Sequence, residues 1–566
     1  MTTAAVRFPL LPLTLTRERL MAWAVPLALF GIALGARLWA AGQITFPANE
    51  GSALYVGVAR NLVEGRGLVS DALWSYATPP LVLPKPAFEL WMPLASLVAA
   101  APMAFLGTTF AAAQLGSVLL GALVGPLTWL VAAEAARHAG LDPGRARMVA
   151  LGSGVVAALL GPFLLAAAVP DSTTPFLVFG LAACVAMART LERPSVGRGV
   201  LLGVLLGLAY LSRQEAVHLA AAFLLLAWPV IRDTGPGRRV GSAARLVGPV
   251  GLGGLAVVVP WLLRNVAAFG TLFPGQALEN AYLATNEQIF AYAERPTLAS
   301  LLAQGMPTIL THQLQALVHD LVSVLLVPAL PIGAIGLISL LALRRSPAVA
   351  RPTALRALLL SGLISYLVTS LVFPVATMWG TFQHAASPLL VGLIVATMLG
   401  VDGAVARLAH ARSWPRANAL LAPLGVLAIV MPFGLLQVSV VGRQATAQEA
   451  RIDAVVAAIA PLAEVAELGS DHRAPARHAA LISDHPVWLA EALRVVALPD
   501  ESAVDVSRLG ADFGTDLVVV LDERGRYPAL WLRDSASACL AVPPPPLETP
   551  TVPAWLIRLQ LGCGTP

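Results

Sequence analysis

A short polar motif near the N-terminus carries the side chains best suited to proton transfer. Asn49 and Glu50 follow an apolar segment, and the residues after them, as far as Leu62, have helical periodicity. At a helix start Asn49 would cap the backbone, and the helix dipole would stabilise the Glu50 carboxylate. A carboxylate fixed in this way is also well placed to accept a proton from an attacking hydroxyl or amine. The motif therefore predicts a helix cap, a general base, or both.

A second acid and several cations occur in other short polar segments. Asp171 lies between two apolar runs, at the same outer face as Glu50, where it would cap the next helix. Lys85 is the only lysine among 37 basic residues, which is either chance in an arginine-biased chain or a cation that holds a phosphate. The other candidate phosphate ligands, each otherwise explained as a helix-end anchor or a packed histidine, are Arg213, Arg264 and His384.

Metal-ligating residues show no site-like spacing. His312 and His319 are seven residues apart, and the three cysteines are scattered. We predict no structural zinc, and the sequence leaves open whether a divalent metal takes part in the chemistry. Cys184 lies in an apolar run and is explained by packing, whereas Cys539 and Cys563 could pair in an oxidising compartment.

The elements that must position these residues are membrane helices. The chain is 57% hydrophobic and only 12% charged, and its apolar runs have the length needed to cross a hydrocarbon core about 30 Å thick. Under the positive-inside rule the arginine-bearing loops between the runs face the cytoplasm, together with the N-terminus. Their arginines also explain the net charge of +5, and no basic stretch interleaved with aromatics indicates a nucleic-acid partner. The arginine-bearing loops are residues 137–147, 189–198, 232–245, 344–356 and 407–416.

Counting the crossings predicts eleven spans within residues 1–441. Residues 88–106 are predicted to form a partly inserted or juxtamembrane helix, because a full crossing there would turn every later arginine loop outward. The first outer loop is then 43–109, and the long outer loop is 265–320. The predicted spans are 20–42, 110–134, 147–168, 172–190, 198–212, 214–231, 246–264, 321–343, 357–373, 385–406 and 417–441.

The pattern changes after the last span. Residues 451–468 read as an amphipathic helix, and 479–483 and 517–521 as strands. We predict a small α/β domain over 442–566. Because it follows an odd number of spans, it should lie on the outer face, with the first outer loop.

Several motifs, taken together, resemble the C-type glycosyltransferases, and most closely glycosyltransferase family 39, the protein mannosyltransferase and aminoarabinose transferase group. The resemblance extends over about residues 20–441. It implies a polytopic α-helical membrane protein with the C-type glycosyltransferase fold and about 11 to 13 spans, extended here by a small extracytoplasmic α/β domain. The motifs are Asn49-Glu50 with Tyr55, Lys85-Pro86 before an aromatic-rich run, Pro170-Asp171, Leu211-Ser212-Arg213-Gln214-Glu215, Phe269-Gly270-Thr271-Leu272-Phe273-Pro274 and Trp379-Gly380-Thr381-Phe382-Gln383-His384.

The resemblance also implies an activity. Such an enzyme of the bacterial plasma membrane transfers a sugar from a polyprenyl-phosphate donor to a protein, lipid or glycan acceptor on the outer face, with inversion at the anomeric carbon. Glu50 and Asp171 would be its acids. The residues that would bind the donor phosphate are Lys85, Arg213, Arg264 and His384.

One departure keeps other functions open. The family motif is usually Asp-Glu, and here Asn49 occupies the Asp position, where a neutral amide cannot accept a proton. Either Glu50 or Asp171 takes the proton, or the chain is a non-catalytic lipid-sugar-binding or scaffold member of the same fold. A lipid transporter or flippase fits less well, because the predicted spans have almost no charge at their centres and show no repeat.

Overall fold

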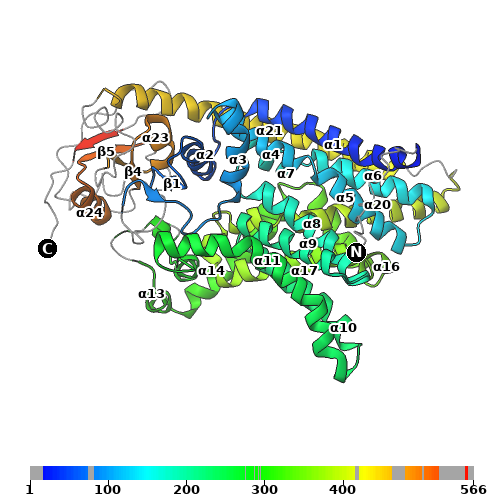
Figure 1. Ribbon diagram of the computed structural model, residues 1–566. Coiled ribbons are helices and arrows are strands. Elements are labelled where there is room, and N and C mark those ends of the chain that lie inside the picture. Colours follow the sequence, from blue (N-terminus) through cyan, green and yellow to red (C-terminus); the bar gives the residue numbers. More distant parts are fainter. Residues whose placement is uncertain are drawn as a thin grey trace, which may run out of the picture.

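The computed structural model describes residues 17–73, 82–274, 276–285, 287–290, 292, 295–414, 420–461, 479–499, 503–521 and 555–558. A long helical bundle carries a small α/β unit at one end, on the left in Figure 1. The predicted cysteine pair, Cys539 and Cys563, lies outside the described residues.

The first part of the bundle contains one early helix, a loop with its own secondary structure, and a series of apolar helices. The loop pairs β1 with β2 in a short antiparallel ladder. In chain order the elements are α1 (Arg17–Gln43), α2 (Glu50–Val63), β1 (Val69–Ser70), β2 (Lys85–Pro86), α3 (Leu94–Leu106), α4 (Phe110–Gly121), α5 (Val124–His138), α6 (Pro143–Leu159), α7 (Gly161–Ala168), α8 (Thr173–Glu192), α9 (Val196–Ser212), α10 (Ala216–Arg232), η1 (Pro236–Arg238) and α11 (Arg239–Phe269).

The second part begins with short helices and ends with the longest helix of the chain. Its elements are α12 (Gln276–Glu279), η2 (Asn280–Tyr282), η3 (Glu287–Phe290), α13 (Leu298–Ala303), α14 (Met306–His319), the π-helix η4 (Asp320–Leu326), α15 (Ile332–Leu343), α16 (Pro347–Ala350), α17 (Thr353–Val372), α18 (Pro374–Thr377), α19 (Thr381–Ala385), α20 (Ser387–Ala411) and α21 (Leu421–Ile459).

The helices agree with a polytopic membrane protein. Eight helices of the described chain are long and apolar enough to cross a membrane, and the bent pair α6 and α7 makes a ninth. The predicted spans 198–212 and 214–231 correspond to α9 and α10, which have 17 residues each and fall just below that length.

Two segments differ from the predicted spans. Residues 321–343 do not form one helix, because Pro328 and Pro331 lie in the break between η4 and α15, and proline disrupts helical hydrogen bonding. Instead, Met306–Leu326 is long and apolar enough to cross a membrane, although most of this helix falls in the predicted long outer loop, 265–320. The count of eleven therefore stays a prediction.

Helix α3 starts later than predicted. The expected helix over 88–106 begins only at Leu94 and has 13 residues. At 1.5 Å per residue it is about 20 Å long, too short to cross a core about 30 Å thick. Its length is therefore that of a partly inserted or juxtamembrane helix.

Helices α9 and α11 pack through glycines. A Cβ atom on Gly203 would lie 2.0 Å from the carbonyl oxygen of Val250, and one on Gly253 would lie 2.2 Å from that of Val200. Small residues at such a contact let two backbones approach closely. Since α9 ends directly before Arg213, this contact also fixes where the Arg213 side chain begins.

The C-terminal unit is the small α/β domain that the sequence predicts. Its sheet has the strand order β4-β3-β5-β6, in which β3 is parallel to β4 and β5, and β6 is antiparallel to β5. Its elements are β3 (Leu481–Ser483), α23 (Pro486–Leu493), β4 (Ala497–Pro499), α24 (Ala503–Phe513), β5 (Leu517–Val520) and β6 (Trp555–Arg558).

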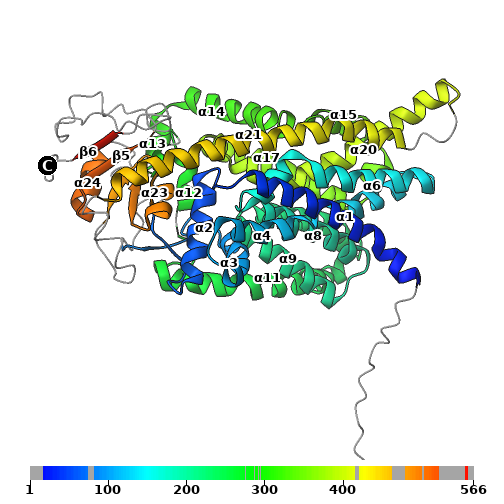
Figure 2. The same cartoon turned by 90° about the horizontal axis from the view of Figure 1, so that it is seen from above.

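The domain is joined closely to the bundle. Helix α21 runs unbroken through the predicted boundary at 441/442 and reaches the domain (Figure 2). The loop before β2 extends the sheet, because Leu73 N donates to Ala497 O at 3.0 Å and Ala497 N donates to Asp71 O at 3.0 Å. One hydrophobic cluster contains side chains of both units, among them Tyr55, Phe88, Trp261, Ile452, Leu481 and Trp488.

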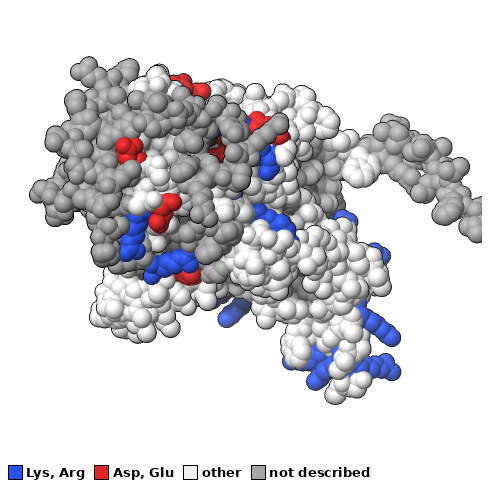
Figure 3. Space-filling model, turned by 60° about the vertical axis from the view of Figure 1, so that its left-hand side comes forward, with Lys and Arg blue, Asp and Glu red and all other residues white. Residues whose placement is uncertain are grey.

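A helical arm formed by the end of α10 and the start of α11 projects from the bundle. Figure 3 shows basic side chains gathered at its tip. These basic side chains belong to the segment from Arg232 to Arg245. This segment is one of the loops that the positive-inside rule assigns to the cytoplasm.

Candidate functional site

Five of the residues singled out in the sequence line one cavity of about 510 Å³. It lies between the first loop, the segments that follow α7, α9 and α18, and the start of α23. The five are Asn49, Glu50, Asp171, Arg213 and His384, and aromatic side chains of Tyr55, Trp91, Trp379 and Trp488 complete the wall.

The Asn49-Glu50 motif begins α2 as expected. The Asn49 side chain accepts a hydrogen bond from Ser52 N at 2.7 Å, which confirms the predicted cap. Glu50 is the first helical residue and is buried. Its Oε1 accepts from Val487 N at 3.1 Å, and its Oε2 lies 3.4 Å from His485 Nδ1. The C-terminal domain therefore supplies both of these contacts to the carboxylate.

Asp171 also lines the cavity, directly before the start of α8. Its Oδ1 accepts from Thr173 N at 2.7 Å, so it holds the first helical residue. Its Oδ2 is 3.4 Å from His384 Nδ1, and the same nitrogen lies 2.6 Å from Thr173 Oγ1. His384, on α19, is about one-third exposed and faces the cavity.

Arg213 connects this cavity to a second one. Its guanidinium donates to Ser172 Oγ at 2.8 Å, to Glu215 Oε1 at 2.5 Å and to Thr381 O at 3.4 Å. Burial would lower the pKa of Arg213, but the Glu215 carboxylate more than offsets this and raises it. The Nε atom is buried without a hydrogen-bond partner among the described residues. Arg213 is therefore a permanent cation between the two cavities.

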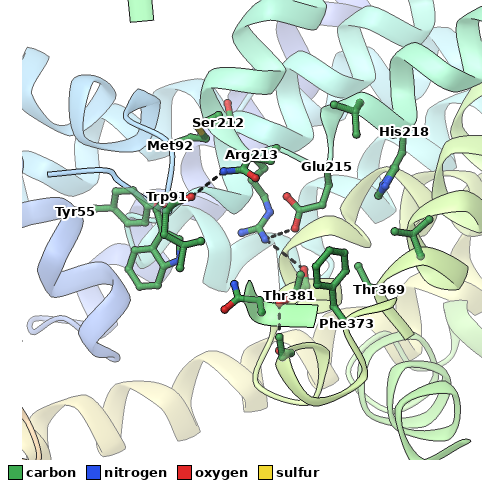
Figure 4. A pocket seen from close by; sticks show the side chains of 16 residues that line it. Tyr55, Trp91, Met92, Ser212, Arg213, Glu215, His218, Thr369, Phe373 and Thr381 are labelled. Carbon is green, nitrogen blue, oxygen red and sulfur yellow. Dashed lines mark hydrogen bonds and ion pairs between the residues drawn. The ribbon is translucent and has the colours of Figure 1, made fainter. Parts of the chain in front are cut away.

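The second cavity, of about 320 Å³, is drawn in Figure 4. It shares Tyr55, Trp91 and Arg213 with the first, and burial raises the pKa of the Tyr55 hydroxyl. Its other wall comes from α10 and α17, whose apolar side chains Val217, Val368 and Phe373 alternate with the polar ones of His218 and Thr369. The second cavity thus adjoins the first at Arg213 and lies against two helices of apolar composition.

Neither of the other two predicted cations lines these cavities. Lys85 Nζ is 2.6 Å from Glu89 Oε2, and the Lys85 side chain is only 4% exposed. Burial lowers the pKa of Lys85, an effect that Glu89 opposes. The Arg264 guanidinium lies 4.8 Å from the Trp261 ring centroid and donates to Leu68 O at 3.3 Å. Their contact with a donor phosphate stays a prediction.

Comparison with known proteins places the fold. No family model and no curated protein matches the sequence. ArnT from Cupriavidus metallidurans bound to undecaprenyl phosphate aligns over 95% of this chain and 99% of its own, with 15% identity and a TM-score of 0.55. The Archaeoglobus fulgidus oligosaccharyltransferase in complex with zinc and sulfate aligns over 88% of this chain and 68% of its own, with 12% identity and a TM-score of 0.55. Both are C-type glycosyltransferases. The chain has the C-type glycosyltransferase fold.

Within the part of this C-type glycosyltransferase fold that the structure describes, no group of three or more His, Cys, Asp or Glu residues is placed to hold a metal ion. Two acid–histidine pairs, Asp171 with His384 and Glu50 with His485, line the first cavity, and neither is joined by a third such residue among those that the structure describes.

Sequence reasoning missed the contribution of the C-terminal domain to the site. His485 and Trp488 line the cavity with Glu50, although more than 430 residues separate them along the chain. The available signal was the Ser483-Asp484-His485 segment, which carries polar side chains at the end of a predicted strand. In parallel sheets the carboxyl ends of strands are where ligands commonly bind.

Proposed function

We propose that the chain is a membrane glycosyltransferase that moves a sugar from a polyprenyl-phosphate donor to an acceptor on the outer face, with inversion. The observation that carries this proposal is the pair of joined cavities. Acids and cations converge in the larger one, and the smaller one lies along α10 and α17, where Val217, Val368 and Phe373 give it an apolar part. A solved structure of the same fold contains undecaprenyl phosphate. Glycosyltransferase family 39 is the branch we propose.

The donor phosphate would lie next to Arg213. As the bond between the anomeric carbon and the phosphate oxygen breaks, the oxygen keeps the electron pair, and a fixed cation stabilises that charge. Arg213 is the cation common to both cavities, so the phosphate would sit where they meet and the isoprenoid chain would follow α10 and α17. His384, held by Asp171 and Thr173, would supply a second donor.

Glu50 is the residue we propose as the base. Asp171 lies beside the cations, since the adjacent Ser172 accepts from Arg213, and this places it on the phosphate side. Glu50 lines the part of the cavity that the C-terminal domain closes, and we place the acceptor hydroxyl or amine there, on the face of the sugar opposite the phosphate. The acceptor oxygen or nitrogen bonds to the anomeric carbon, its proton passes to Glu50, and the polyprenyl phosphate leaves. A single displacement of this kind inverts the configuration.

Transfer by reconstituted variants tests the proposal. Wild type, Glu50→Gln and Asp171→Asn would be supplied with a panel of radiolabelled polyprenyl-phosphate sugars and membrane acceptors. We expect Glu50→Gln to lose about 100-fold or more of the transfer rate, as is typical when a general base is removed. Donor binding should be retained. Glu192→Gln, at the far end of α8, is the matched control and should transfer normally.

Asn49 favours a second candidate function, a non-catalytic protein that binds lipid-linked sugars. Its amide oxygen is used by the cap and cannot take a proton from an acceptor. If no donor in the panel is transferred while donor lipid still binds to the wild type, this second function replaces the first. A response of the transfer rate to Asn49→Asp would instead support an enzyme.

A further inference from the structure

The C-terminal domain closes the cavity directly beside Glu50. Helix α23 begins at Pro486, and the backbone N–H of Val487 and the ring of His485 both approach the Glu50 carboxylate. Trp488, one residue further, donates from Nε1 to Pro47 O at 3.1 Å and lines the same cavity. The wall on the Glu50 side of the cavity is thus built by two parts of the chain that are distant in sequence.

His485 is held from several directions. Its backbone N donates to Ser483 Oγ at 3.1 Å, and its ring centroid is 5.1 Å from that of Trp488. Its two ring nitrogens face different acids, with Nδ1 at 3.4 Å from Glu50 Oε2 and Nε2 at 3.9 Å from Asp484 Oδ2. Asp484 is itself fixed, because both of its carboxylate oxygens accept from Leu521 N, at 2.9 and 3.1 Å.

The charges around His485 favour its protonated form. Burial lowers the pKa of the imidazole, and Arg451 on α21 also lowers it, but Asp484 and Glu50 raise it by more. The net pKa is therefore above the ordinary histidine value. A protonated ring has an N–H on each nitrogen, so Nδ1 can donate to Glu50 while the positive charge of the ring faces Asp484 at 3.9 Å.

The domain is locked in the position that brings His485 to Glu50. Arg60 on α2 pairs with Glu491 on α23 at 2.5 Å, and Glu64 at the end of α2 pairs with Arg494 at the end of α23. Gly57 faces this contact, where a Cβ atom would lie 2.9 Å from Glu491 Oε2. These ion pairs join the C-terminal ends of α2 and α23, and the contacts of Glu50 with Val487 and His485 join their N-terminal ends.

We propose that His485 is a positioning residue of the candidate transferase site, which orients the Glu50 carboxylate from the C-terminal domain. The inference rests on the proposed function. The domain then completes the catalytic site in addition to any contact it makes with the acceptor.

Kinetics of His485 variants test the role. We expect His485→Ala to lower kcat about 10- to 100-fold, the rate equivalent of losing a hydrogen bond to a charged group, with the donor KM unchanged. His485→Asn keeps an N–H donor at the position of Nδ1, toward Glu50, and should restore much of kcat. It should also abolish the fall in rate at high pH that deprotonation of His485 causes in the wild type. His410→Gln, an exposed histidine in the last turn of α20, is the control.

A second measurement does not depend on turnover. In protein with ¹³C-labelled histidines, the signal missing from His485→Asn identifies His485, and its pH titration can be followed by NMR. We expect Glu50→Gln to lower the pKa of His485, because the Glu50 carboxylate is one of the charges that raise it.

The outcomes separate the two proposals. If wild type transfers sugar but His485→Ala has the same kcat and pH profile, the positioning role is overturned and the proposed function stands. If the wild type transfers no sugar, the proposed function fails and the positioning role of His485 fails with it. If Glu50→Gln leaves the His485 titration unchanged, the contact itself is overturned.

Discussion

Arg213 lines both cavities, and its hydrogen-bond partners decide which substitution can test its role in phosphate binding. Glu215 pairs with it, and the Glu215 side chain is only 14% exposed. Arg213→Gln would leave that carboxylate without its cation, a change that costs about 3–5 kcal/mol in buried pairs. Arg213→Lys keeps the charge and loses the planar fork that suits a phosphate.

We expect Arg213→Lys to weaken binding of undecaprenyl phosphate about tenfold, which corresponds to the loss of one hydrogen bond to a charged group. Binding would be measured by fluorescence with a labelled lipid in nanodiscs. Arg198→Lys, at the opposite end of α9, should bind like the wild type. Unchanged binding by Arg213→Lys would place the phosphate elsewhere, and Lys85 and Arg264 would become the cations to test.

Asn49 has a structural role that can be separated from any chemical one. Its Oδ1 accepts from Ser52 N at 2.7 Å and caps α2. We expect Asn49→Ala to destabilise the protein by about 1 kcal/mol, the usual cost of losing such a cap. Asn49→Asp should keep the stability of the wild type, since aspartate caps as well and favours the helix dipole. Apparent unfolding temperatures in detergent would show the difference, and equal losses in both variants would contradict the cap.

At the scale of secondary-structure elements, the contact between α9 and α11 supports the site from a distance. A Cβ on Gly203 would meet a backbone carbonyl at 2.0 Å, and a backbone cannot move aside as a side chain can. We expect Gly203→Ala to separate the helices, to cost about 1–3 kcal/mol as overpacking commonly does, and to reduce transfer by displacing Arg213.

The control is on the partner helix. Gly251 of α11 has open space where its Cβ would be, so Gly251→Ala should leave unfolding temperature and transfer unchanged. Equal behaviour of the two variants would mean that the glycine contact does not hold α9 in position.

Several features of the helices and of the C-terminal domain could be predicted from the sequence. The start of α2 at Asn49 follows from local chemistry, because a cap involves only neighbouring residues. The predicted cap at Asp171 was wrong by one position, since Ser172 is the N-cap of α8, although the Asp171 carboxylate still accepts from the backbone of Thr173. The apolar character of the spans, the α/β type of the C-terminal domain and the resemblance to C-type glycosyltransferases were also confirmed. In contrast, the predicted boundary at 441/442 marks the end of the apolar pattern, whereas helix α21 continues through it to Ile459.

Pairings across the fold were beyond the sequence. Lys85 looked like a free cation, yet it pairs with Glu89 four residues later in a non-helical segment, where no helical period announces the contact. His485 meets Glu50 only because α23 docks on α2, and that docking depends on Arg60, Glu491 and the sheet extension at Ala497. Such contacts are set by tertiary structure and leave no local signal.

For the molecule as a whole, the central question is which side of the membrane each end occupies. The arm between α10 and α11 carries basic side chains at its tip (Figure 3), whereas the α/β domain sits at the end of the bundle that holds the candidate site (Figure 1). The positive-inside rule predicts that the arm is cytoplasmic and that the domain and site are outside. This orientation matters for function, because it decides on which face the donor and acceptor must meet.

Single cysteines report the orientation directly. In a variant with its three cysteines replaced, Asp233→Cys would mark the arm and Ala511→Cys the domain, at two positions that are both exposed. We expect a membrane-impermeant maleimide to label Ala511→Cys in intact cells and Asp233→Cys only after permeabilisation. Labelling of both positions in intact cells would mean that they share one side, and the predicted number of crossings between them would then be wrong. The reverse pattern would put the cavity on the cytoplasmic face, the side on which nucleotide sugars are available. Donor and acceptor would then meet on that face, and transfer at the outer face would be excluded.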